Sequence, residues 1–457
     1  MAKEKDLITK AAEAPAEALE ATIEATAKAA VAVYNVKPIK RGRDYWHTLG
    51  PGLTTGASDD DPSGIATYSQ VGAQYGYGLL WLAAFTFPLM AIIQEMCARI
   101  GIVTGRGLAG NIRNRFARPV IYICTVLLFA ANTFNIGADL GAMAKGVQLL
   151  QPRWDFALIV IAFTFVCLLA QIFVPYVRYA KYLKWLAMVL LAYVVSAVLA
   201  HLNWAAVAQN AVVPHLKFNK DQLLLVTAIL GTTISPYLFF WQTSQEVEEE
   251  ILQGKTTILQ RQEVKTLDEI KHMRADVWSG MFLSNVVMFF IIAACGGILF
   301  THGITNITSA AQAAEALRPF AGNATYWLFA AGIIGTGLLA IPVLAGSSAY
   351  ALAEAFTWRE GLYRSLRQAY AFYGVLIVSM ILGLAMNFIG IDPIKALIYS
   401  AVANGLVAPV ILFLIVILAS DRKLMGDWVN KPYITALGWV ITGLMVVAGI
   451  GAIISLF

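Results

Sequence analysis

The sequence predicts an all-α protein that crosses a membrane many times. Hydrophobic residues make up 59% of the 457 residues and charged residues only 13%, and the mean hydropathy is +0.67. Soluble domains carry about 25% charged residues. Long apolar runs, separated by short polar stretches, continue from residue 48 to the end of the sequence. Lipid must therefore surround most side chains, and we expect a lipid bilayer but no nucleic acid among the partners.

The apolar runs divide the chain into candidate helices. A hydrocarbon core of about 30 Å needs roughly 20 apolar residues per helix. Eleven segments meet this requirement, near 48–73, 78–103, 119–147, 155–175, 183–202, 222–246, 277–301, 322–356, 369–389, 394–419 and 434–457. We expect residues 46–457 to form one eleven-helix transmembrane domain. Residues 1–45 would form a cytoplasmic tail, with an amphipathic helix near 10–32.

The distribution of basic residues orients the predicted helices. With the N-terminus in the cytoplasm, 27 of the 33 Lys and Arg residues fall in the tail and in the cytoplasmic turns. This asymmetry follows the positive-inside rule. An odd number of spans then places the C-terminus outside. We expect a multi-pass protein of the plasma membrane.

Charge and helix-breaking residues interrupt the first segment near its middle. Asp59, Asp60 and Asp61 are followed directly by Pro62, and then by Gly64. One charge at mid-membrane costs at least about 2.5 kcal/mol, so three carboxylates cannot face lipid. Proline removes a backbone donor, and irregular backbone at this depth must line protein or a water-filled cavity. The pattern indicates a broken helix beside an internal site, and the alternative is an interfacial loop.

The sixth segment has a similar interruption, because residues 231–236 combine glycine, threonine and serine with a proline. Such kinks are common in membrane helices. Here, however, segments 1 and 6 would each begin one of two five-helix repeats. Paired interruptions at corresponding positions indicate the midplane site of a secondary transporter. We therefore predict a LeuT-type fold: two inverted five-helix repeats plus an eleventh helix, with helices 1 and 6 broken. Helix C-termini direct carbonyl oxygens into such a site, which favours a cation.

Several stretches resemble the Nramp metal transporters. Residues 61–64, Asp-Pro-Ser-Gly, stand where that family has Asp-Pro-Gly-Asn, and the likeness continues through 72–81, 98–106 and 420–426. The resemblance covers nearly the whole chain after residue 45. It implies a divalent-metal transporter that is not an enzyme and needs no cofactor. It also implies that Asp61 binds the metal, with Asp60 and the carbonyl of Thr232 nearby.

Three departures from the family motif change the expected substrate. Ser235 replaces the methionine of a Met-Pro-His motif, Gly64 replaces an asparagine ligand, and Ala401 falls where helix 10 carries a glutamine. A thioether favours softer transition metals. Mg²⁺ keeps several waters and uses one or two carboxylates. The pattern is similar to the Nramp-related magnesium transporters, so we expect partly hydrated Mg²⁺, and also Mn²⁺, in a widened site. Asn404, one turn beyond Ala401, is a further candidate for lining it.

The same motif bears on proton coupling. Tyr237 stands where the family has a histidine that titrates near neutrality, and a phenol has a pKa of about 10. In helix 3 the polar candidates for proton movement are Asn132, Asn135 and Asp139. Asp139 is either a proton acceptor or an internal carboxylate with its own partners. We expect transport without proton coupling, by a monomer.

Three other functions fit parts of the sequence. A proton-coupled Mn²⁺/Fe²⁺ transporter with a diverged site is the nearest alternative, although the methionine and histidine are missing. A sodium-coupled amino-acid transporter would need an uncharged break in helix 1 to receive a substrate carboxylate. An intramembrane aspartyl protease would need a Gly-x-Gly-Asp string, and residues 137–139 do not match it.

Overall fold

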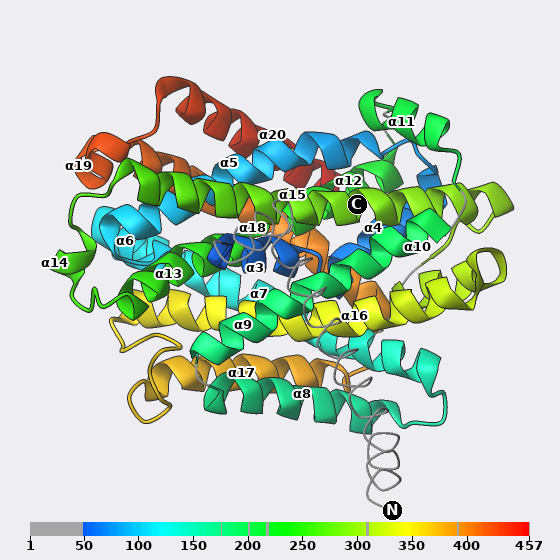
Figure 1. Ribbon diagram of the computed structural model, residues 1–457, viewed down its shortest axis with the longest axis horizontal. Coiled ribbons are helices and arrows are strands. Elements are labelled where there is room, and N and C mark those ends of the chain that lie inside the picture. Colours follow the sequence, from blue (N-terminus) through cyan, green and yellow to red (C-terminus); the bar gives the residue numbers. More distant parts are fainter. Residues whose placement is uncertain are drawn as a thin grey trace, which may run out of the picture. The chain divides into compact units, whose positions relative to one another are not determined.

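The computed structural model describes residues 49–174, 176–199, 202–215, 219–307, 310–390 and 393–456. Every regular element in these ranges is a helix (Figure 1). Residues Pro51–Phe457 form one compact unit. The helix predicted near 10–32 lies outside the described residues, and the boundary between tail and transmembrane domain stays a prediction.

Each of the eleven predicted segments corresponds to a helix or to an interrupted helix. The elements, in chain order of the predicted spans, are α3 (Pro51–Asp59) with α4 (Pro62–Tyr75), α5 (Trp81–Thr104), α7 (Arg118–Leu150), α8 (Phe156–Phe173), α9 (Tyr176–Leu186) with α10 (Leu191–Leu199), α12 (Lys220–Thr233) with α13 (Pro236–Leu252), α15 (Leu267–Ile298), α16 (Ala310–Phe356), α17 (Tyr370–Met386), α18 (Pro393–Ser420) and α20 (Pro432–Leu456). Nine helices of the described residues are long and apolar enough to cross a membrane. The others are the two halves of span 1 and the shorter α17. The predicted all-α, multi-pass fold is confirmed.

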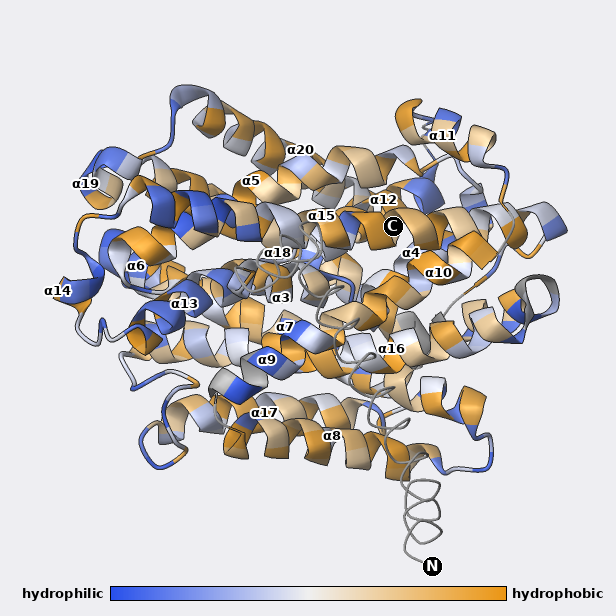
Figure 2. Ribbon diagram, viewed as in Figure 1, coloured by the Kyte–Doolittle hydropathy of each residue, from blue (hydrophilic) through white to orange (hydrophobic). Residues whose placement is uncertain are grey.

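Short helices occupy loops for which the hydropathy pattern predicts no span. They are α6 (Leu108–Arg115), α11 (Trp204–Val212), α14 (Ile258–Arg261) and α19 (Arg422–Met425). Elements α6, α14 and α19 lie at one end of the transmembrane helices and α11 at the other (Figure 1). Hydrophilic residues gather at the end that carries α6, α14 and α19 (Figure 2). The three loops that contain α6, α14 and α19 therefore lie at the same end of the transmembrane helices, and their assignment to the cytoplasm stays a prediction.

Both predicted breaks are present, and both are built in the same way. Helix α3 ends at Asp59 and α4 begins at Pro62; α12 ends at Thr233 and α13 begins at Pro236. Each proline takes the first position of the second half-helix, where its missing N–H leaves no intrahelical hydrogen bond unmade. The two interruptions thus follow directly from the two prolines and the small polar residues before them.

Close packing holds the first half-helix against α15. The carboxylate of Asp276 accepts hydrogen bonds from the backbone N–H groups of Gly52, at 2.7 Å, and Leu53, at 3.1 Å. It thereby caps the N-terminus of α3, where backbone donors have no intrahelical partner. A Cβ on Gly56 would collide with the backbone of Gly280. Small residues at a helix interface let two backbones approach in this way, and α3 is fixed beside α15.

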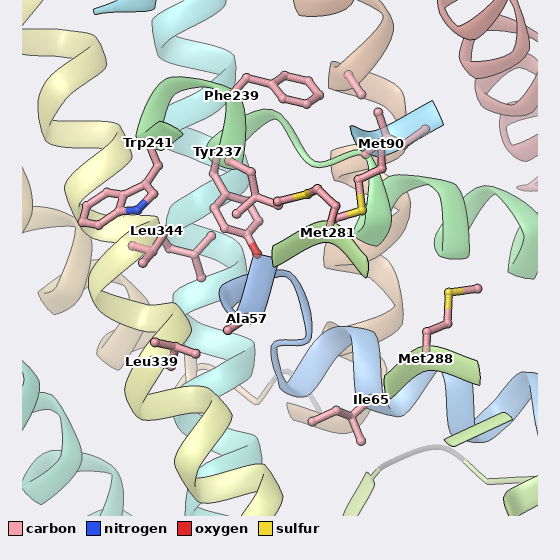
Figure 3. Close-up of a cluster of buried hydrophobic side chains, with 14 of the residues drawn as sticks. Ala57, Ile65, Met90, Tyr237, Phe239, Trp241, Met281, Met288, Leu339 and Leu344 are labelled. Atoms are coloured by element: carbon pink, nitrogen blue, oxygen red, sulfur yellow. The ribbon is translucent and has the colours of Figure 1, made fainter. Parts of the chain in front are cut away.

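Large apolar side chains surround the breaks. Figure 3 shows Tyr237 and Trp241 of α13 beside Leu344 of α16, with Met281 of α15 on the other side of the Tyr237 ring. Tyr237 and Trp241 are each only 1% exposed. This packing excludes lipid from the region where the polar backbone groups of both broken helices meet.

Candidate metal-binding site

Asp61 lies in the break of helix 1, and its side chain is engaged on both oxygens. It is the N-cap of α4 and is 1% exposed. Its Oδ1 accepts hydrogen bonds from the Ser63 hydroxyl and the Gly64 N–H, each at 2.7 Å. Its Oδ2 accepts one from Asn135 Nδ2 at 2.7 Å. These neutral donors, at the positive end of a helix, favour the carboxylate form and fix the orientation of the Asp61 side chain.

The break of helix 6 contributes carbonyl and hydroxyl oxygens. The hydroxyl of Ser235 donates to the carbonyls of Gly231 and Thr232, each at 2.7 Å. A carbonyl oxygen has two lone pairs, so the Thr232 carbonyl can still accept a ligand. The Ser235 hydroxyl oxygen likewise keeps lone pairs. Where the family motif would place sulfur, this chain presents a hard oxygen.

A tyrosine joins the two breaks. The Tyr237 hydroxyl donates to the carbonyl of Ser58 at 2.7 Å. That carbonyl belongs to the last turn of α3, where carbonyls lack intrahelical partners. In Figure 3 the hydroxyl of Tyr237 points toward the ribbon beside Ala57. The hydroxyl is therefore part of the connection between helices 1 and 6, and is not directed toward a bulk-water path.

The small residues predicted to widen the site lie where the broken helices approach each other. A Cβ built on Gly64 would lie 3.0 Å from Thr232 Oγ1 and 3.3 Å from the carbonyl oxygen of Asp59. Gly64 and Thr232 are therefore neighbours across the two breaks. These contacts are already tight for a Cβ, so a side chain as large as asparagine at residue 64 would require the neighbouring atoms to move.

Helix α18 contributes through its backbone and through one amide. Gly231 of α12 packs against the carbonyl of Ala401, so closely that a Cβ there would collide with it. Asn404 is 1% exposed, and its Oδ1 has no hydrogen-bond partner among the described residues. The structure thus places Ala401 beside the last turn of α12. Among the described residues, neither Ala401 nor Asn404 forms a hydrogen bond with Asp61.

Helix 3, which is α7, faces the site with residues that the sequence presented as proton candidates. Asn135 binds Asp61 directly, as described above. Asn132 instead donates to α16, at the Leu344 carbonyl and two serine hydroxyls. Asp139 is fully buried, and neither of its oxygens has a hydrogen-bond partner among the described residues. The interpretation of Asp139 as an internal carboxylate with its own partners requires hydrogen bonds that the described residues do not supply. The interpretation as a proton acceptor does not require them.

Asp59 and Asp60 do not share the surroundings of Asp61. Ser284 on α15 donates from its hydroxyl to Asp59 Oδ2 at 2.9 Å. Both oxygens of Asp60 are buried, and neither has a hydrogen-bond partner in the part of the chain that the structure describes. Across the described ranges, no group of three or more His, Cys, Asp and Glu side chains is arranged to hold a metal ion. A cation at Asp61 would therefore complete its shell with carbonyls, hydroxyls and water.

Comparison with known sequences decides the family. The sequence model of the Nramp family, described as natural resistance-associated macrophage protein-like, matches residues 52–455. This chain belongs to the Nramp family. A curated relative is the divalent metal cation transporter MntH of Klebsiella pneumoniae, which is 28% identical over 406 residues, covering 87% of this chain and 91% of the relative.

Solved structures place this Nramp chain among transporters of one fold. A manganese transporter of Eremococcus coleocola, in complex with an aromatic bis-isothiourea substituted compound, superposes with a TM-score of 0.68 at 18% identity, covering 90% of this chain and 87% of the other. Mhp1, a nucleobase-cation-symport-1 family transporter in a closed conformation, gives 0.56 at 16% identity, covering 89% and 91%. The likeness to two otherwise different transporters confirms the predicted LeuT-type fold.

Sequence reasoning missed some partners of this Nramp site. It did not assign Ser63 and Asn135 to Asp61, or Ser284 to Asp59. The Ser63 contact had a local signal, because a serine two residues after an aspartate commonly hydrogen-bonds back to it in a turn or cap. The other two partners come from α7 and α15, and the sequence does not show which turn of a distant helix faces the break.

Proposed function

We propose that this chain transports divalent cations, namely partly hydrated Mg²⁺ and also Mn²⁺, across the plasma membrane without proton coupling. The observation that carries the proposal is the oxygen chemistry of the two breaks. Asp61 supplies a fixed buried carboxylate, and the helix 6 break supplies the Thr232 carbonyl and the Ser235 hydroxyl. Carboxylate, carbonyl and water oxygens suit Mg²⁺ and Mn²⁺ alike.

Hydration is central to the proposed selectivity. Mg²⁺ gives up its waters reluctantly and is bound by one or two carboxylates. Asp61 supplies only one carboxylate here, so most of the coordination shell of the ion would remain water. Loss of the thioether removes the chemical filter that favours transition metals. The expected result is broadened selectivity, in which Mg²⁺ gains access and Mn²⁺ is not excluded.

The membrane potential would drive the uncoupled transport. Each elementary charge gains about 2.3 kcal/mol per 100 mV, so a dication entering an inside-negative cell gains about 4.6 kcal/mol. No proton gradient is then required for accumulation. We further propose that the protein acts as a monomer, with the N-terminus in the cytoplasm and the C-terminus outside.

Proton-coupled Mn²⁺ transport is the second candidate, and one observation favours it. Asp139 is buried in α7, and within the described ranges neither of its oxygens has a hydrogen-bond partner, so it can take up a proton. The Eremococcus coleocola protein is, by its name, a manganese transporter. The replacement of histidine by Tyr237 argues against a relay through helix 6.

The test is uptake into proteoliposomes with a negative internal potential and dyes for internal Mg²⁺ and pH. We expect Mg²⁺ entry above that of empty liposomes, with no internal acidification beyond theirs. The alternative predicts acidification in fixed proportion to the metal that enters. Absence of Mg²⁺ entry in liposomes that do take up Mn²⁺ would overturn the proposal.

A further inference from the structure

Two carboxylates beside the proposed transport site have no use in it. Asp60 is 0% exposed, and neither of its oxygens has a hydrogen-bond partner among the described residues. Asp59 is equally buried, and its Oδ1 is also without a partner. No ion pair within the described ranges joins either residue to a Lys, Arg or His. Two adjacent buried carboxyl groups are therefore left without a countercharge.

Buried charges in proteins are paired or coordinate metals, and deep in a membrane an uncompensated carboxylate pair is particularly unfavourable. The buried carboxylate of Asp61 accepts hydrogen bonds from three neutral donors on its two oxygens. Asp60 has none of these donors. A single unpartnered carboxyl group such as Asp139 can be neutralised by one proton, whereas Asp59 and Asp60 are adjacent and together carry the charge that balances one dication. This pairing points to a ligand that is itself positively charged.

The two groups of oxygens are directed toward different helices. Asp61 is tied to Asn135 on α7, whereas Asp59 is tied to Ser284 on α15. The Ser284 hydroxyl also lies near the carboxyl group of Asp60. The hydrogen-bond partners of Asp59 and Asp61 therefore lie on two different helices.

We propose that Asp59 and Asp60, with the hydroxyl of Ser284, form a second cation site, separate from Asp61, that takes a hard divalent cation. Two carboxylates balance the charge of one dication. The oxygen-only donor set, which contains neither sulfur nor imidazole, suits ions such as Mg²⁺, Mn²⁺ and Ca²⁺. The identity of the ion rests on the proposed function, because the transported cation is of the same class and would reach both sites by one route.

The test counts bound ions on the purified full-length protein, with Mn²⁺ alone as the probe. Titration followed by the electron paramagnetic resonance signal of free Mn²⁺ gives the number bound per chain. We expect about two for the unchanged protein, and one each for Asp60→Asn and Asp61→Asn. Asp427→Asn, an exposed aspartate in the loop after helix 10, is the matched control and should keep two.

Ser284→Ala keeps the proposal testable if Asp60→Asn fails to fold, which gel filtration would reveal. Loss of that hydroxyl should weaken binding of one Mn²⁺ by about tenfold and leave the other unchanged. Unchanged affinity for both ions in Ser284→Ala would contradict the proposal. So would a single Mn²⁺ on the unchanged protein, or the loss of all binding in each of the two aspartate variants, since both results mean one shared site.

These outcomes separate the second site from the proposed function. One Mn²⁺ per chain, lost in Asp61→Asn together with uptake, would remove the second site and leave the proposed function intact. Two Mn²⁺ per chain, of which Asp61→Asn loses one without any loss of Mg²⁺ uptake, would support the second site and refute the assignment of Asp61.

Discussion

The breaks of helices 1 and 6 have the same backbone design and opposite chemistry. In each, a proline begins the second half-helix after a short non-helical stretch. The break of helix 1 carries three buried carboxylates. The break of helix 6 carries no charge, and its Ser235 hydroxyl donates to carbonyls of the same break. Repeat symmetry therefore fixes the shape of both breaks, whereas side chains alone decide which one attracts a cation.

The largest loss of transport is expected when the charge of Asp61 is removed from the break of helix 1. Two unit charges 4 Å apart interact by about 4 kcal/mol at an effective dielectric constant of 20, and 1.4 kcal/mol is about tenfold in affinity. Asp61→Ala should therefore lower Mg²⁺ uptake by about a hundredfold or more. Asp61→Asn keeps the acceptor for Ser63 and Gly64, and its amide N–H can donate to the unpartnered Oδ1 of Asn135 after that amide flips. This variant should fold normally and be equally inactive. Uptake at the unchanged rate in either variant would refute the site.

The uncharged break can be made more like that of its relatives. Ser235→Met restores the thioether of the family motif and displaces retained waters. We expect the ratio of Mn²⁺ to Mg²⁺ uptake to rise by about tenfold, corresponding to about 1.4 kcal/mol. Two controls bear on this. Ser235→Ala removes the hydroxyl without adding sulfur, and Met143→Leu removes the sulfur that packs against Gly337 near Pro62. If Met143→Leu alone lowers the ratio, a thioether already acts at the site.

Removing the hydrogen bond that joins the two breaks should have a moderate effect on uptake. Tyr237→Phe leaves the Ser58 carbonyl without its donor, and a hydrogen bond contributes about 1 kcal/mol. Uptake should fall by about fivefold at most, and its dependence on pH should not change. Tyr433→Phe, at an exposed tyrosine, is the matched control. Complete loss of transport, or a new pH dependence, would show that the Tyr237 hydroxyl handles protons.

The smallest effect is expected from removing an ion pair that lies far from both breaks, and it concerns the stability of the protein. Arg115 Nε lies 2.8 Å from Asp421 Oδ2, joining α6 to α19. Although partial burial raises the pKa of Asp421, the Arg115 hydrogen bond and the Lys423 and Leu424 N–H groups outweigh it and hold the pKa below its ordinary value. The stabilisation is therefore present above a pH of about 4 and is lost as pH falls through the lowered pKa.

Asp421→Asn should lower the free energy of unfolding by less than about 1 kcal/mol at neutral pH, because the pair is partly exposed. Thermal unfolding of the purified protein at pH 7 and at a pH well below 4 measures this, and the difference between the two proteins should shrink at the lower pH. Transport should not change. A difference that grows on acidification would mean that Asp421 is stabilised in its protonated form.

The fold was predictable because lipid imposes long apolar runs, and because a proline after small polar residues stops a helix. The same reasoning missed α6, whose 8 residues include Asn111, Arg113 and Arg115 and have no apolar run. It also placed the end of helix 6 near 246, although α13 continues to Leu252. Charged residues do not end a helix. In this last part of α13, Glu248 is buried, and its carboxylate accepts hydrogen bonds from the Tyr350 hydroxyl and the Leu362 N–H.

The candidate site was predictable only within each broken helix. Asp61, Gly64 and Thr232 follow from the motif and from the position of the prolines. The structure adds that Asp61 is bound by Asn135 and that Asp60 is not. Those facts depend on how α7 and α15 are rotated about their axes, which hydropathy does not encode. A run of three aspartates therefore looks uniform in sequence and is divided between two environments in the fold.

Competition between the two ions tests the central claim most directly. Mn²⁺ uptake is measured in proteoliposomes at a fixed negative potential while external Mg²⁺ is raised in large excess. If one oxygen-lined site at Asp61 carries both ions, Mg²⁺ should suppress Mn²⁺ uptake completely and by simple competition. Mn²⁺ uptake that a large excess of Mg²⁺ does not reduce would contradict the account, because the two ions would not share a site.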